Sequence, residues 1–240
     1  QEYHKEISLT IPSILLGNKY HTISKILTSE MASELYSFLP ESTKLSIPVL
    51  LYSTYKDGWS MEGVLAKTHN FDPLIIIIRA LRSKVVIGAY CTGRLSPPSP
   101  HVRGTGETFV FRLTPPTSVH RWTYIPSAKK ESRNQYLVSC REYIAVGASA
   151  EHGTNAIRID GDLRTCSSGP SDTFQNPPLV PEEDSYSTQS QKSKQYPTNS
   201  SLLYPPLFSS VGNPFPIEEI EIIHVPSSIT KNRDSKRKLR

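Results

Sequence analysis

The sequence predicts a mainly β protein (α+β), an antiparallel β-sandwich of two sheets flanked by a few short helices. Its apolar residues gather in short runs rich in β-branched and aromatic side chains, and turn-forming residues separate these runs. One run, 74–78, is apolar at every position, which indicates a strand buried on both faces. Few segments have the spacing of an amphipathic helix. Short strands with frequent turns are typical of antiparallel pairing in a sandwich.

Two short helices are expected before this apolar run. Segment 29–39 places apolar residues on one face, with Ser29 as the expected N-cap and Pro40 as the end of the helix. A second helix is expected to begin at Ser60, after a turn at 56–58. The strands that the pattern predicts are 49–53, 74–78, 84–91, 108–113, 122–125, 135–139, 143–146, 156–160 and 217–225.

One domain, 24–226, is expected to follow an N-terminal extension, 1–23. Within it, segment 180–214 has ten Ser or Thr and five Pro, and its weak periodicity predicts a flexible insertion between two strands. A basic, disordered tail, 227–240, is expected at the end. Because the chain begins with Gln1 and no signal-like apolar region follows, we interpret it as a segment of a longer protein.

Charge and composition narrow the classes of partner. The net charge of +5 is accounted for by segment 231–240, which holds six Lys or Arg and one Asp. The remainder is neutral, which argues against a nucleic-acid-binding domain. Three widely spaced cysteines favour a reducing compartment, and no apolar run is long enough to cross a membrane. The tail residues that could contact acidic lipid or a partner are Lys231, Arg233, Lys236, Arg237, Lys238 and Arg240.

The loop 104–108, Gly-Thr-Gly-Glu-Thr, resembles a phosphate-binding loop but leads into a strand instead of a helix, so we reject that interpretation. By strand alternation, Glu107 shares the face of Phe109 and Phe111. We therefore expect a mostly buried architectural carboxylate that caps backbone N–H groups or pairs with Arg79 or Arg158.

Other chemistry rests on weaker patterns. Glu107 could join Asp160 and Asp162 in a carboxylate group if their strands are neighbours. Cys166 lies near a cation and could pair with His152 as a nucleophile, and the alternative is an ordinary loop cysteine. The histidines are scattered, and segment 160–171 lacks the oxygen ligands of an EF-hand at its fifth and twelfth positions. We expect no metal and no cofactor.

Six motifs in order then resemble the TLDc domain over about residues 24–226. They are LLYST with DGWS (50–60), VIGAY (86–90), GTGETFVF (104–111), AIRIDGDL (156–163), DTFQNPPL (172–179) and the closing strand 215–223. The stretch 88–94 is most similar to TLDc domains that follow a TBC Rab-GTPase-activating domain, as in Skywalker-type synaptic proteins. Two positions depart from the family pattern: Ala148 replaces the second of two glycines, and Ile223 replaces an aromatic residue.

The resemblance implies a β-sandwich, roles in oxidative-stress protection and synaptic vesicle trafficking, binding to the V-ATPase, and a cytoplasmic location on vesicle or presynaptic membranes. Rab GTPase activation would belong to an absent TBC domain. Because no motif brings together a nucleophile, a base and a hydrogen-bond donor, we favour an interaction module. The alternatives are an enzyme using Glu107, Cys166 or His152, and a membrane-surface module using the tail. The motif residues expected to be structural are Gly88, Gly104, Gly106, Glu107, Asp160, Asp162, Thr173, Phe174, Asn176 and Pro177.

Overall fold

The computed structural model describes residues 24–44, 46–96, 99–124, 126, 133–181 and 212–226. The predicted N-terminal extension, most of the predicted insertion and the basic tail lie outside these residues. The two ends of the predicted insertion do belong to the fold: Val180 is buried in the core, and a strand begins at Asn213.

Four helices and eleven strands make up the described part of the chain. The helices are α2 (Ser29–Phe38), α3 (Glu41–Lys44), α4 (Thr54–Asp57) and α5 (Met61–Thr68). The strands are β1 (Val49–Ser53), β2 (Leu74–Ala80), β3 (Val86–Cys91), β4 (Ser99–Arg103), β5 (Phe109–Arg112), β6 (Ser118–Arg121), β7 (Leu137–Ser139), β8 (Tyr143–Val146), β9 (Ile157–Asp160), β10 (Thr165–Ser168) and β11 (Asn213–His224).

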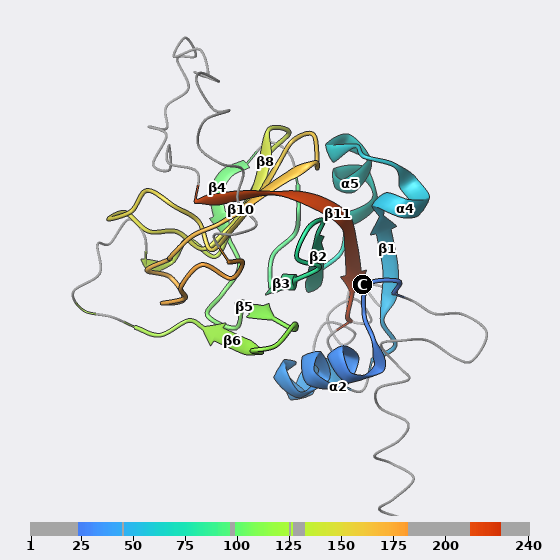
Figure 1. Cartoon of the computed structure of the whole chain (residues 1–240), viewed down its shortest axis with the longest axis horizontal. Helices are drawn as coiled ribbons and strands as arrows, with labels where there is room; N and C mark the ends of the chain where they lie inside the picture. The colour runs from blue at the N-terminus through green and yellow to red at the C-terminus, as the bar shows by residue number, and fades with distance from the viewer. Residues whose placement is uncertain are drawn as a thin grey trace, which may run out of the picture.

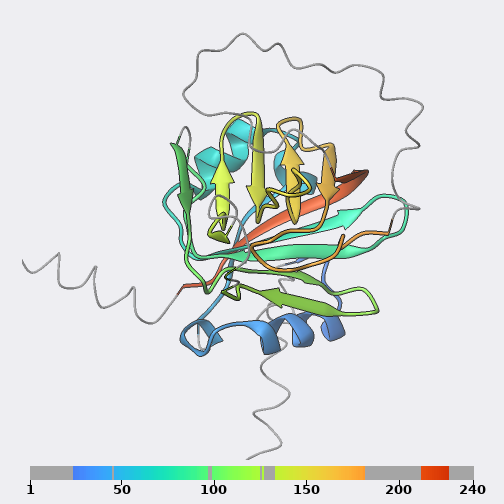
Figure 2. The ribbon, with the colours of Figure 1, turned by 90° about the vertical axis from the view of Figure 1, so that its left-hand side faces the viewer.

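The strands form two antiparallel sheets that share β11. The pairing order is β4-β7-β8-β9-β10-β11-β2-β3-β5-β6, and β1 pairs with the other side of β11. The first residues of β11 pair with β10, and the rest pair with β2 and β1 (Figure 1). Figure 2 shows β7 to β10 standing across the strands of the other sheet, which contains β2, β3, β5 and β6. Helix α2 lies beneath that sheet. The predicted two-sheet β-sandwich with short helices is confirmed.

Two apolar layers hold this arrangement together. The first lies between the sheets and includes Ile76 and Ile78 of β2, and the second lies between β2, β3, β5 and α2 and includes Ile75 and Ile77. Alternate residues of β2 therefore enter different layers, as strand geometry requires. This confirms that β2 is buried on both faces. Phe109 and Phe111 enter the second layer, as their alternation predicts.

Most predicted strands are present, and the misses have a common cause. No strand forms at 122–124; the strand lies at β6, just before. We did not predict β4 or β10. The sequences of these three strands are polar or contain proline, so each lacks the β-branched and aromatic run on which the prediction depends.

Helix ends follow capping chemistry. Thr28, rather than the expected Ser29, caps α2, because its side chain accepts the amide of Met31. The second helix was expected to begin at Ser60; α5 begins one residue later, and Ser60 is its N-cap, accepting the amide of Gly63. The expected turn at 56–58 is the end of α4, and Gly58 leaves this helix with φ of +79°.

Candidate functional site

The loop 104–108 is a hydrogen-bonded turn. Gly104 has φ of +97°, a conformation that favours glycine, and the hydroxyl of Thr92 accepts the amide of Thr105 at 2.8 Å. The prediction that Glu107 is buried is wrong, because its side chain is exposed. The amide of Thr108 donates to the carbonyl of Thr105 at 3.0 Å, so the chain turns here and strand alternation begins only at Phe109.

Two motif glycines occupy close contacts. A Cβ on Gly88 would lie 2.2 Å from the carbonyl oxygen of Ile76 and 2.5 Å from the ring of Phe111. A Cβ on Gly106 would lie 3.1 Å from the ring of Trp122. Gly88 thus lets two strands and a buried ring pack together, which no larger residue allows.

The expected carboxylate group does not form. Asp160 lies on β9 and Glu107 precedes β5, and four strands separate β9 from β5 in the pairing order. Asp160 forms an ion pair with Arg158 at 3.5 Å, and Asp162 accepts the amide of Arg164 at 2.8 Å. Strand order, which the sequence does not reveal, decides this outcome. Arg158 therefore pairs with Asp160, not with Glu107.

The structure places Cys166 in a strand, not in a loop. Its side chain is fully buried between the sheets, and its thiol donates to the carbonyl of Ser167 at 3.7 Å. Burial raises the pKa of Cys166 above its ordinary value, so the thiolate is disfavoured. His152 is exposed in the loop after β8. This placement argues against the alternative in which Cys166 pairs with His152 as a nucleophile.

The motif 172–179 closes the end of the sheet that contains β8 and β9. The hydroxyl of Thr173 accepts the amide of Ala148 at 3.1 Å. Asn176 is buried; its amide group donates to the carbonyls of Gly169 at 3.0 Å and Pro177 at 2.8 Å. Pro177 itself is exposed.

Phe174 explains one glycine of this loop. Gly147 has φ of +68°, and a Cβ there would lie 2.8 Å from the ring of Phe174. At the next position, Ala148 fits in place of the family's second glycine and is fully buried. This departure from the family pattern leaves the loop packed.

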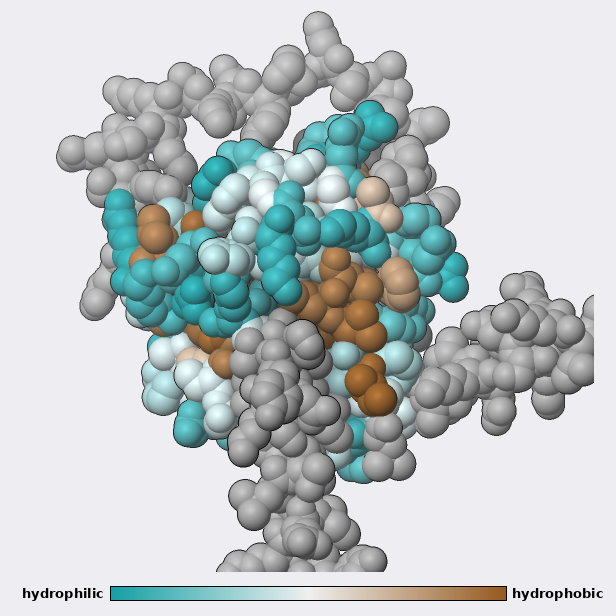
Figure 3. Space-filling model, turned by 90° about the vertical axis from the view of Figure 1, so that its right-hand side faces the viewer, coloured by the Kyte–Doolittle hydropathy of each residue, from teal (hydrophilic) through white to brown (hydrophobic). Residues whose placement is uncertain are grey.

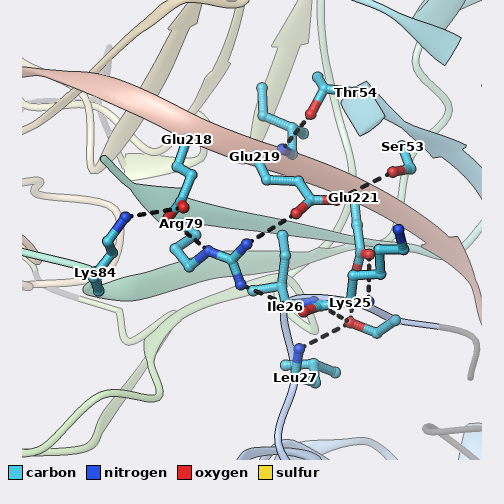
Figure 4. A network of polar contacts seen from close by, with 12 residues as sticks. Lys25, Ile26, Leu27, Ser53, Thr54, Arg79, Lys84, Glu218, Glu219 and Glu221 are labelled. Carbon is cyan, nitrogen blue, oxygen red and sulfur yellow. Dashed lines mark hydrogen bonds and ion pairs between the residues drawn. The ribbon is translucent and has the colours of Figure 1, made fainter. Parts of the chain in front are cut away.

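A group of paired charges on β11 was not predicted from the sequence. A bulge between Ile217 and Glu219 places Glu218 and Glu219 side by side on the edge facing β2. Arg79 of β2 bridges them, with Nε 2.8 Å from Glu218 and Nη2 3.0 Å from Glu219 (Figure 4). The available signal was three acids, Glu218, Glu219 and Glu221, within a strand otherwise rich in apolar residues.

Further charges complete the two ends of this group. Lys84 binds Glu218 at 2.9 Å. Although burial pushes the pKa of Glu218 up, the hydrogen bond of Lys84 and the charge of Arg79 hold it below its ordinary value. Glu219 is buried and accepts the hydroxyl of Ser53 at 3.3 Å. Arg79 therefore pairs with the glutamates of β11. The expected ion pair between Arg79 and Glu107 does not form.

Glu221 anchors a segment that we call the N-terminal strap, residues 24–27. Its carboxylate accepts the hydroxyl of Ser24 and, at 2.7 Å, the amide of Lys25. The ammonium group of Lys25 lies 2.9 Å from the ring centroid of Tyr55. Burial, and then the charge of Glu219, raise the pKa of Glu221 above its ordinary value.

The charged side chains around Arg79 and the three glutamates of β11 have a structural role. They join the strap, β1, β2 and β11, and each of the carboxylates is bonded to the protein. The described residues include no group of three or more His, Cys, Asp or Glu placed to hold a metal ion. Within the same residues, no helix is long and apolar enough to cross a membrane.

The class of this protein is defined by a two-sheet sandwich that shares β11, together with the GTGE turn before β5 and the DTFQNPP loop packed near Ala148. The family model for the TLDc domain matches residues 20–225. The chain belongs to the TLDc family.

The chain is similar to three curated relatives. The chain is 30% identical over 162 residues to GTPase-activating protein skywalker of Drosophila melanogaster, covering 62% of this chain and 27% of the relative. It is 28% identical over 136 residues to human nuclear receptor coactivator 7, covering 56% of this chain and 13% of the relative. Oxidation resistance protein 1 of Yarrowia lipolytica is 26% identical over 182 residues, with 72% of this chain and 75% of the relative covered. The chain thus spans a minor part of the first two.

Proposed function

We propose that this chain is an interaction module, which acts in synaptic vesicle or endosomal trafficking and in protection against oxidative stress through protein partners such as the V-ATPase. In a longer TBC–TLDc protein, Rab GTPase activation would belong to the TBC domain. The proposed location is cytoplasmic, on the surface of vesicle or presynaptic membranes. The names of the relatives, a GTPase-activating protein and an oxidation resistance protein, support this direction.

The observation that carries the proposal is the use of reactive side chains to hold the fold. Cys166 is buried in the core, and Asp160 pairs with a neighbouring arginine. Glu219 and Glu221 bind strands and the strap. A nucleophile or general base must reach a substrate with a suitable pKa, and these groups serve contacts inside the protein instead.

The V-ATPase part is tested by titrating the 240-residue chain against the isolated V1 sector. We expect saturable binding with a Kd below about 50 μM, within the range of weak specific complexes. The matched control replaces the basic tail residues Lys231, Arg233, Lys236, Arg237, Lys238 and Arg240 by serine. Binding that survives in this variant assigns the interaction to the domain. If the unmodified chain does not bind the V1 sector, the V-ATPase proposal is refuted.

The two alternatives have their own measurements. If the tail contacts acidic lipid, vesicles containing phosphatidylserine bind the chain but not the serine variant, and added salt weakens the binding. If the domain is an enzyme acting on peroxides, the chain consumes peroxide with turnover and Glu107→Gln loses this activity while its melting temperature is unchanged. Turnover with that loss would overturn the interaction-module proposal.

A further inference from the structure

The outer edge of β1 is open in the described part of the chain. Its backbone pairs with β11 on one side, and no described strand pairs with the other. Ile47 is 79% exposed and Val49 47% exposed, and Figure 3 shows apolar surface on the face of the molecule that carries β1. An open edge with exposed apolar side chains readily accepts another strand, and proteins usually protect such edges with charges.

A second edge shows the contrast. β6 is the last strand of its sheet, and its exposed residue is Arg121. The guanidinium of Arg121 lies 4.6 Å from the ring of Phe109, so this edge carries a charge in the usual manner. β1 has no charged residue to protect its edge in this way.

The N-terminal strap brings upstream chain to this edge. Ser24 and Lys25 are bonded to Glu221, which is the partner of Ser53 in the pairing of β1 with β11. The ammonium group of Lys25 reaches Tyr55, directly after β1. The described chain therefore begins beside β1, as Figure 1 shows in blue.

The sequence upstream of the strap has the pattern of a strand. Ile7, Leu9 and Ile11 alternate with Ser8 and Thr10, and a proline follows at position 12. Residues 12–23 separate this pattern from the strap and can span up to about 40 Å when extended. A five-residue strand is about 17 Å long, so the linker reaches either end of β1.

We propose that residues 7–11 pair with the open edge of β1 as an additional strand and cover Ile47 and Val49. The occupant is thus this chain's own N-terminal segment. Main-chain hydrogen bonds would hold it, and Ile7, Leu9 and Ile11 would meet the exposed apolar residues. An N-terminal region held in this way has its position fixed relative to the sandwich.

Hydrogen exchange of the 240-residue chain tests this pairing. Leu9→Pro removes an amide donor and disfavours the strand, so amides at 49–52 that point away from β11 should exchange at least about tenfold faster than in the unmodified chain. Leu15→Pro, the same change outside the proposed strand, should leave these rates unaltered. Exchange of β2 reports whether the sandwich itself is intact in each variant.

A cross-link gives an independent measurement. In a Cys140→Ser background, Val49→Cys is combined in turn with Ile7→Cys, Leu9→Cys or Ile11→Cys. Paired strands place facing Cβ atoms about 5 Å apart, so one combination should form a disulfide at least about tenfold faster than Val49→Cys with Leu15→Cys.

Two outcomes would overturn the proposal. Equal exchange at 49–52 in the unmodified chain and in Leu9→Pro, with no favoured cross-link, would mean that residues 7–11 do not cover β1. Protection that grows with protein concentration and survives Leu9→Pro, together with a dimer in sedimentation, would assign the edge to a second copy of the chain.

Discussion

Replacement of Gly88 by alanine is the sharpest test of how β3 packs between its neighbours β2 and β5. The added Cβ would lie 2.2 Å from the carbonyl oxygen of Ile76 and 2.5 Å from the ring of Phe111. That oxygen belongs to the backbone of β2, which pairs with β3 at Ile77 and Gly88, so it cannot withdraw without separating the two strands. Overpacking of a core costs about 1–3 kcal/mol, and a backbone clash belongs at or above the upper end.

We therefore expect Gly88→Ala to lower the free energy of unfolding by about 3 kcal/mol or more. For a domain of this size that corresponds to a fall in Tm of about 6–12 °C. Thermal and urea unfolding followed by circular dichroism measure both quantities. The matched control is Gly63→Ala within α5, whose Cβ would lie 3.4 Å from the nearest atom, of Tyr52. Alanine there should stabilise by about 0.5–1 kcal/mol. A Gly88→Ala protein as stable as the parent would refute the packing described for β3.

Three further predictions concern buried polar groups. The raised pKa of Glu221 means that the folded state holds this proton more tightly than the unfolded state, so its contribution to stability falls as pH rises from about 4.5 through the raised value. Glu221→Gln should therefore gain stability relative to the parent across that range, and a pH-independent difference in urea midpoints would contradict this. In the native protein, a thiol reagent should label partly exposed Cys140 but not buried Cys91 and Cys166. The labelling of Cys140 should itself be slow, because burial raises the pKa of its thiol to about 11. Labelling at comparable rates would show that the core is open. Asn176→Ala should cost about 2–4 kcal/mol, because it leaves buried backbone and hydroxyl partners unsatisfied, and a loss below 0.5 kcal/mol, roughly the noise of surface changes, would count against that network.

Elements with strong local signals could be predicted from the sequence. The apolar run at β2 and the capping serine before α5 define their elements through short-range chemistry. β10 could not be found in this way, because Thr-Cys-Ser-Ser becomes a strand only through its two neighbours, β9 and β11. Pairing across long sequence distances is invisible to periodicity.

In the candidate site, too, local patterns were predictable and long-range contacts were not. Strand alternation correctly placed Phe109 and Phe111, but the turn at 105–108 ended the alternation before Glu107. The acids of β11 interrupt an apolar strand, and only the bulge and Arg79 explain how they are accommodated. A buried acid within a strand requires a partner, and here the adjacent strand supplies it through Arg79.

The position of β11 in the chain has a consequence for biosynthesis. It is the last described strand to leave the ribosome, yet it is the neighbour of β1, β2 and β10. Until it emerges, those strands lack their shared partner, and the nascent chain exposes apolar edges that favour aggregation. The strap meets the same late strand at Glu221, across 196 positions of sequence. Such long-range contacts slow folding, so the sandwich can close only when translation of the domain is nearly complete.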